Sequence, residues 1–302
     1  MRIIITMLTV ASLLLFGLAS GGKAQTGTLK IYISVDMEGV AGVVTGEQLG
    51  PAGFEYNRFR EFMTDEVNAA IRGILDAGPA EIMVSDSHGN GQNILIDKLP
   101  RGVTLVRSWP RPLMMMQGID QTFDGVIFIG YHTGTNNTSG VRAHTISSAR
   151  LTDVQLNGVS MPEAGVNAAI AGQFNVPVIM ISGDDAIVKE ATALLGNIEG
   201  AVVKWAISFH SARSLTPADA CDQIMLKARK AVSRLREFKP YSVSKPVRLD
   251  VRFKSYRPPE LLGYLPIVER TDSHAIRFVG KDMTEVSKFL EFITSYDPAL
   301  EP

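Results

Sequence analysis

The chain of 302 residues has 30 basic and 31 acidic side chains, which gives a formal charge of −1 at pH 7. This balance gives no general attraction for nucleic acid, and 45% hydrophobic residues are enough to bury a core, so a disordered chain is excluded. A single cysteine excludes an internal disulfide and a cysteine-rich metal site. Any metal would therefore be held by oxygen and imidazole ligands.

Residues 1–24 have the features of a bacterial secretory signal. Arg2 precedes an apolar run from Ile3 to Leu18, and small residues lead to an expected cleavage site after Ala24. The alternative is a retained anchor helix, but the run is short for the roughly 20 residues that cross a bilayer. We therefore expect an exported protein, periplasmic or secreted, with no stable membrane anchor after cleavage.

Strands and helices alternate after this segment. Short apolar runs rich in β-branched residues predict strands, and apolar residues at helical spacing predict helices. The expected strands are Leu29–Val35, Ala80–Ser85, Gly102–Val106, Gly125–Ile129, Leu151–Leu156 and Pro177–Ile181, and the expected helices are Tyr56–Ala77 and Pro162–Phe174. The turn Asn157-Gly158 suggests that Leu151–Leu156 begins a hairpin. This order is typical of an α/β fold with a mostly parallel sheet flanked by helices.

The pattern changes after about Gly200. Pro217–Glu237 has the spacing of an amphipathic helix, and Pro246–Phe253 alternates like a half-exposed antiparallel strand. We therefore expect a metal-binding catalytic α/β domain over residues 25–200 and a smaller C-terminal α+β domain over residues 201–302.

Polar residues directly follow four of the expected strands. The four segments are Asp36-Met37-Glu38-Gly39, Asp86-Ser87-His88-Gly89, Tyr131-His132-Thr133-Gly134 and Gly183-Asp184-Asp185. Ligands of a parallel sheet bind outside the carboxyl ends of its strands. Because an unpaired buried carboxylate is costly, this grouping favours a divalent metal site that neutralises the carboxylates.

Three histidines extend the candidate site. Asp36 and Glu38 lie two positions apart in an extended segment and therefore face the same side. His88 and His132 follow strands, and His144 follows a loop rich in Gly, Asn and Thr. Each histidine alone is equally well explained by a surface position, but the three together favour a shared site.

Glu163 has two interpretations. Ser160-x-x-Glu163 is the pattern of a capping box at the start of a helix, in which the glutamate has only a structural role. In the other interpretation its carboxylate joins the metal site.

Asp36, Glu38, His88, His132 and Glu163 make five candidate ligands. Carboxylates with imidazoles and no thiolate suit zinc, or manganese and cobalt, better than calcium. Five ligands exceed what one tetrahedral zinc with an open position needs, and they suit two metals that share a bridging carboxylate. Such a pair generates hydroxide at neutral pH, so the residues predict a hydrolase, with His144 free to move a proton or stabilise an intermediate.

Several short segments match a known family in their order and spacing. They are Ser34-Val35-Asp36-Met37-Glu38-Gly39, Asp86-Ser87-His88, Gly130-Tyr131-His132, Glu163-Ala164-Gly165, Gly183-Asp184-Asp185, Ala201-Val202-Val203-Lys204 and Ser211-Ala212-Arg213-Ser214-Leu215. With them the chain resembles the bacterial D-aminopeptidases of the dipeptide-permease operon type, the DppA-like zinc peptidases, from about Lys30 to Glu291.

The resemblance implies an α/β domain with a smaller second domain. It also implies two zinc ions per subunit, held by Asp36, Glu38, His88, His132 and Glu163, with Asp36 as the bridge. His144 would act in catalysis, assisting a metal-activated hydroxide that attacks the scissile carbonyl. The implied activity is removal of N-terminal D-residues from short peptides such as D-Ala-D-Ala.

The resemblance further implies a homo-oligomer, with rings stacked into a decamer. The expected export signal departs from the family, whose members are cytoplasmic, and would place this protein near the D-amino-acid peptides of peptidoglycan.

Two alternatives remain open at this point. One is a two-metal hydrolase of L-dipeptides or phosphoesters, and the other is a non-catalytic exported binding protein. The chain lacks the Gly-Asn-His-Asp/Glu segment of metallophosphatases, a phosphate-binding P-loop and a Gly-x-Ser-x-Gly motif. Chelation separates the remaining classes, because it would abolish turnover by the enzyme and leave ligand binding by the binding protein intact.

Overall fold

The computed structural model describes residues 28–297. The signal segment expected over residues 1–24 lies outside the described residues. Within residues 28–297, no helix combines the length and the apolar character needed to cross a membrane.

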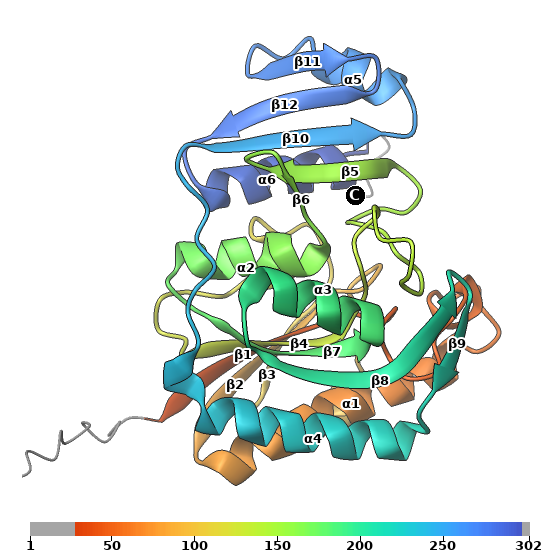
Figure 1. Cartoon of the computed structure of the whole chain (residues 1–302), viewed down its shortest axis with the longest axis vertical. Helices are drawn as coiled ribbons and strands as arrows, with labels where there is room; N and C mark the ends of the chain where they lie inside the picture. The colour runs from red at the N-terminus through yellow and green to blue at the C-terminus, as the bar shows by residue number, and fades with distance from the viewer. Residues whose placement is uncertain (1–27, 298–302) are drawn as a thin grey trace, which may run out of the picture.

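A seven-stranded sheet forms the larger layer (Figure 1). Its strand order is β3-β2-β1-β4-β7-β8-β9, and all neighbours are parallel except β8 and β9. The strands are β1 (Leu29–Val35), β2 (Ala80–Asp86), β3 (Thr104–Val106), β4 (Gly125–Tyr131), β7 (Val178–Asp184), β8 (Glu199–Ser208) and β9 (Ser211–Ser214). Because β1 lies between β2 and β4, three of the polar segments that follow strands meet at the centre of the sheet.

Helices cover both faces of this sheet (Figure 1). They are α1 (Tyr56–Ala77) and α4 (Pro217–Ser233) on one face, and α2 (Glu163–Gln173) and α3 (Asp185–Leu195) on the other. Ile31 and Ile33 of β1 belong to the core under α1 and α4, whereas Tyr32 belongs to the core on the opposite side. A strand buried on both faces must be apolar at consecutive positions, which explains the unbroken LKIYISV run.

A five-stranded antiparallel sheet forms the second layer, with strand order β11-β12-β10-β5-β6. Its strands are β5 (Leu151–Leu156), β6 (Val159–Ser160), β10 (Val247–Phe253), β11 (Val268–Asp272) and β12 (Ala275–Gly280), and α5 (Arg257–Leu262) lies beside it. The helix α6 (Met283–Ser295) lies between this sheet and α2 (Figure 1). Four short 3-10 helices complete the described elements: Gly46–Gln48, Ile96–Lys98, Met114–Met116 and Leu235–Glu237.

The expected fold class is confirmed: a mostly parallel sheet flanked by helices, with an additional antiparallel part. The hairpin expected at Asn157-Gly158 is present and joins β5 to β6.

The two sheets, however, do not divide the chain at residue 200, where the sequence suggested a domain boundary. β8 pairs with β7 and carries the parallel sheet past residue 200, and α4 then covers that same sheet. In the other direction, β5 and β6 precede residue 200 but belong to the second sheet, where β5 pairs with β10 and β6 pairs with β5. The reason is that a strand belongs to the sheet whose neighbouring strand it hydrogen-bonds. In an antiparallel sheet that neighbour can come from a distant part of the chain.

Candidate metal centre

Two backbone contacts bring the ends of β1 and β4 together. The amide of Asp36 donates to the carbonyl of Ile129 at 2.8 Å, and the amide of Gly39 donates to the carbonyl of Gly130 at 2.6 Å. A Cβ atom at Gly39 would lie 2.0 Å from the carbonyl oxygen of Tyr131, so only glycine permits this approach. Asp36 thereby lies beside His132.

The first triad consists of Asp36, Glu38 and His88, all buried. Nδ1 of His88 lies 3.1 Å from Oδ1 of Asp36 and 2.9 Å from Oε2 of Glu38. Nε2 of His88 donates to the carbonyl of Leu49 at 2.7 Å. Because the carbonyl only accepts, the proton of the neutral ring is on Nε2, and Nδ1 offers its lone pair to the same space as the two carboxylates.

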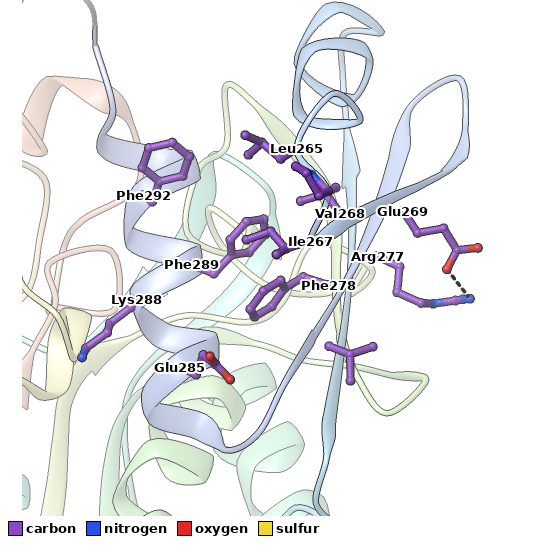
Figure 2. Close-up of a pocket in the computed structure, with 12 residues that line it drawn as sticks. Leu265, Ile267, Val268, Glu269, Arg277, Phe278, Glu285, Lys288, Phe289 and Phe292 are labelled. Atoms are coloured by element: carbon purple, nitrogen blue, oxygen red, sulfur yellow. Dashed lines mark hydrogen bonds and ion pairs between the residues drawn. The ribbon is translucent and has the colours of Figure 1, made fainter.

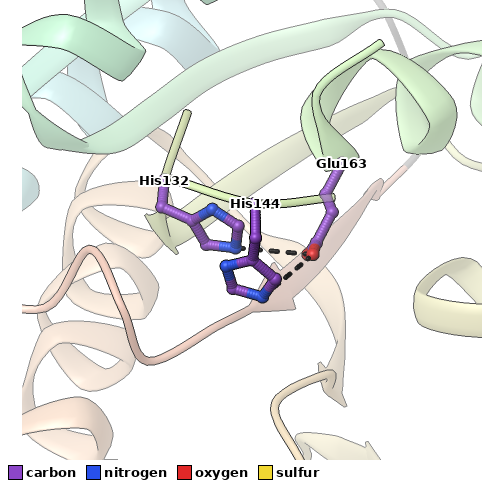
Figure 3. Close-up of side chains that lie close together, drawn as sticks. All are labelled: His132, His144 and Glu163. Carbon is purple, nitrogen blue, oxygen red and sulfur yellow. Dashed lines mark ion pairs between the residues drawn. The ribbon is translucent and has the colours of Figure 1, made fainter. Parts of the chain in front are cut away.

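The second triad consists of His132, His144 and Glu163 (Figure 3). Oε1 of Glu163 lies 3.4 Å from Nε2 of His132 and 3.7 Å from Nε2 of His144. The two rings stack with their centroids 4.0 Å apart. Nδ1 of His132 donates to the carbonyl of Thr133, and Nδ1 of His144 donates to the carbonyl of Arg142. Both Nε2 atoms are therefore left to face the Glu163 carboxylate.

Asp36 connects the two triads. Its Oδ1 faces His88, and its Oδ2 lies 3.2 Å from Nε2 of His132. One carboxylate oxygen is thus directed to each group, which is the geometry of a bridging ligand.

The capping-box interpretation of Glu163 is wrong. Pro162 occupies the cap position of α2, and no side chain caps this helix. Oε1 of Glu163 instead accepts a hydrogen bond from the amide of Ile146 at 2.7 Å and faces the two histidines. The Ser160 pattern is present, but β6 holds Ser160 in the second sheet, so the reciprocal bonds of the box do not form.

Two of the carboxylates that follow strands stabilise loops and do not belong to the triads. Asp86 accepts hydrogen bonds from the amides of Asn93 and Ile94, and so closes the loop that carries His88. Asp184 caps α3 through the amide of Ile187 and accepts from the amide of Val141 at 2.8 Å, next to the segment that carries His144. These two residues position the loops of the site.

The donor set fits two metal ions. Oδ2 of Asp36, Oε2 of Glu38 and Nε2 of His132 are buried and have no hydrogen-bond partner among the described residues. Burial raises the pKa of Asp36, and the neighbouring Glu38 carboxylate raises it further. Burial by itself lowers the pKa of His132, but the Glu163 and Asp36 carboxylates raise it well above its usual value. Without metal, these buried groups therefore favour their protonated forms, which reduces the repulsion between the carboxylates. Divalent cations would reduce the same repulsion without protonation.

The backbone after Asp36 is held by two buried charged residues that the sequence analysis did not assign to the site. Nζ of Lys204, in β8, donates to the carbonyls of Glu38, Val40 and Val43 at 2.5, 3.1 and 2.7 Å. Oε1 of Glu66, in α1, accepts from the amide of Ala41 at 2.9 Å. Burial lowers the pKa of Lys204 to about 8 and raises the pKa of Glu66 to about 7. The sequence signals for Lys204 are its charge at the end of the apolar run AVVK and the place of that segment in the family resemblance, neither of which assigned it a role.

A cavity of about 620 Å³ opens onto members of both triads. Trp109, Met115 and Ile146 give it an apolar part, and Glu291 and Thr294 of α6 give it a polar part. Its volume is in the range of small-molecule sites. The site therefore combines a candidate two-metal centre with room for a short peptide.

A model of the D-aminopeptidase family matches residues 29–292. The chain belongs to the D-aminopeptidase family. A D-aminopeptidase of Bacillus subtilis (strain 168) is 33% identical to it over 267 residues, which cover 88% of this chain and 97% of that protein. The solved structure of the zinc-dependent D-aminopeptidase DppA from Bacillus subtilis, a self-compartmentalizing protease, matches with a TM-score of 0.85 and 32% identity, over 88% of this chain and 97% of that one. The family expected from the sequence is confirmed.

In this D-aminopeptidase family member, we expect Lys204→Met to destabilise the loop that follows Asp36. The change leaves three carbonyls without their donor and lowers the free energy of unfolding by about 3 kcal/mol, measured by denaturant titration. Lys189→Met, on the exposed side of α3, is the control and leaves the unfolding midpoint unchanged. Equal midpoints for the two variants would show that Lys204 has no such role.

Proposed function

We propose that this protein is a two-zinc D-aminopeptidase that removes the N-terminal D-residue from short peptides such as D-Ala-D-Ala. The observation that carries this proposal is the position of Asp36, which directs one carboxylate oxygen to each of two buried triads. Membership of the D-aminopeptidase family and the zinc dependence of the Bacillus subtilis relative support the choice of reaction and metal.

The proposed donor set follows from the geometry. Asp36 would be shared by the two ions, Glu38 and His88 would complete the donor set of one, and His132 and Glu163 would complete that of the other. Carboxylate oxygen and neutral imidazole nitrogen are both good zinc ligands, and manganese or cobalt accepts the same set. The carbonyls that accept from the histidine N–H groups fix each ring with its lone pair facing the site.

The chemistry that a zinc pair supplies when bound is polarisation of the scissile carbonyl and a lowered pKa for water. The protein supplies orientation and a proton carrier. His144 donates from Nδ1 to the carbonyl of Arg142, and its Nε2 is directed to the cavity, 3.7 Å from Glu163. In this position Nε2 can take a proton from the attacking group and return it to the leaving amine.

We also propose that the protein assembles into a homo-oligomer, with a decamer as the expected form. The support is the description of the Bacillus subtilis relative as self-compartmentalizing, together with a match over 97% of that chain. Assembly around a closed space would restrict access to short peptides.

Export is a further part of the proposal. Its support is the sequence of residues 1–24, where a basic start, an apolar run and small residues before the expected cleavage site are typical of a secretory signal. An exported D-aminopeptidase would meet the D-amino-acid peptides of the cell wall.

Metal removal tests the proposal directly. We expect the purified protein to hold two zinc equivalents and to release D-alanine from D-Ala-D-Ala, and we expect a chelator to abolish this release until zinc is restored. Metal analysis and a D-alanine assay measure both quantities, with L-Ala-L-Ala as the stereochemical control. Two bound metals without release from the D-peptide would contradict the proposed substrate, and the absence of metal would contradict the site.

Asp36→Ala is expected to cost more than any other single substitution in the site. It removes a ligand from both ions, so we expect loss of both zinc equivalents and at least about a thousandfold loss of kcat/KM. Glu38→Ala removes a ligand from one ion and is expected to retain one equivalent. Asp65→Ala, an exposed position on α1, is the matched control. Two retained zinc ions in the Asp36 variant would refute the bridging assignment.

His144→Ala is expected to keep both zinc ions and lose about a hundredfold in kcat, since a positioned proton carrier contributes on that order. Metal analysis alongside turnover separates this role from ligation. Loss of one zinc equivalent would instead make His144 a ligand, as its place in the second triad also allows. His274→Ala, at a half-buried position in the turn between β11 and β12, serves as the control.

A further inference from the structure

Helix α6 closes the cavity on the side of the second sheet. Its Ser287 hydroxyl donates to the carbonyl of Pro112 at 2.9 Å, and the Arg150 guanidinium donates to the carbonyl of Thr294 at 2.6 Å. These contacts attach one face of α6 to segments on two sides of the cavity. Glu291 lies on the same face, one helical turn after Ser287, and its side chain lines the cavity.

One of the two carboxylate oxygens of Glu291 accepts no hydrogen bond from the described residues. Glu291 is 7% exposed, and Oε1 accepts a hydrogen bond from the Ser295 hydroxyl at 2.9 Å. The other oxygen has no hydrogen bond, and the residue forms no ion pair with any part of the chain from 28 to 297. The nearby cation, Arg111, gives its N–H groups to the main chain and to Ser85.

Glu291 is also separate from the metal ligands. In each triad the ligand atoms lie within 4.8 Å of one another, and Glu291 belongs to neither group. A buried carboxylate that faces a cavity without a direct ion pair is costly, and a ligand that brings a cation to it reduces that cost.

We propose that Glu291 binds the N-terminal ammonium group of the peptide substrate, and so makes the site selective for peptides with a free amine. This inference rests on the proposed aminopeptidase function and names the group that recognises its substrate. The ammonium has three N–H donors, of which the free Glu291 oxygen accepts one. Trp109, Met115 and Ile146 form the apolar part of the same cavity and suit a small aliphatic side chain.

Glu291→Gln keeps the shape of the side chain and the contact with Ser295 but removes the charge. The matched control is Glu285→Gln, the same change on the same helix. Glu285 lines the groove between α6 and the strands β11 and β12 (Figure 2), and it is not among the residues that line the cavity at the metal centre. The probes are D-Ala-D-Ala and propionyl-D-alanine, which lacks only the amine, each applied to the zinc-loaded protein.

We expect Glu291→Gln to raise KM for D-Ala-D-Ala about tenfold or more, with kcat changed less than about threefold and zinc content unchanged. Affinity for propionyl-D-alanine, measured by calorimetry, is expected to be equal in the variant and in the unaltered protein. Glu285→Gln is expected to match the unaltered protein in every measurement. An unchanged KM for D-Ala-D-Ala, or equal losses for the two probes, would overturn the role of Glu291.

The two proposals fail in different ways. If the unaltered protein binds D-Ala-D-Ala without hydrolysing it, the proposed function is wrong, and calorimetry with Glu291→Gln still measures the ammonium contact. If it hydrolyses L-Ala-L-Ala in place of the D-peptide, the same comparison is made with the L-peptide and propionyl-L-alanine. If the unaltered protein binds neither dipeptide, the inference about Glu291 is overturned as well.

Discussion

The burial of three carboxylates around the same cluster of histidines is the constraint on which this site depends. Asp36, Glu38 and Glu163 are each at most 5% exposed, and water cannot screen their mutual repulsion. Each faces an imidazole nitrogen whose lone pair is turned to the same space, because a backbone carbonyl accepts the proton of the other ring nitrogen. Such an arrangement is stable with cations between the carboxylates and costly without them. The metal centre is therefore part of the energetics of the fold as well as of its chemistry.

The parallel sheet provides the rigidity that this constraint requires. β1 lies inside the sheet between β2 and β4, and the segment after it is fixed by Gly39 against β4 and by Lys204 from β8. Because these contacts involve backbone groups, they position Asp36 and Glu38 whatever occupies the cavity. Asp86 and Asp184 do the same for the loops near His88 and His144. A buried lysine and two aspartates thus serve the site without belonging to it.

The antiparallel sheet has a different part in the same structure. It packs against α6, and α6 brings Glu291 and Thr294 to the wall of the cavity. The larger layer holds the two candidate triads, while the smaller layer contributes polar groups to the cavity wall. The strand pair β5 and β6, from the middle of the chain, belongs to the second sheet and lies in sequence between His144 and Glu163.

Local pattern predicted the main strands and helices and the fold class, and it grouped Asp36, Glu38, His88, His132 and His144 as candidates for one site, while it left the role of Glu163 open. β1, β5 and α1 have the bounds that their hydrophobic periodicity predicts, and residues directly after parallel strands must meet at one edge of the sheet. Tertiary structure alone decided the rest. Glu163 faces the histidines because β6 holds Ser160 away from the helix, and the sheets do not separate at residue 200 because β8 pairs with β7. Glu66 and Glu291 have no local pattern that marks them, and Lys204 has only its place at the end of the AVVK run, since their partners are backbone groups or a cavity formed by distant segments. Periodicity reports which face of an element is buried, whereas the partner of a buried charge exists only after the chain has folded.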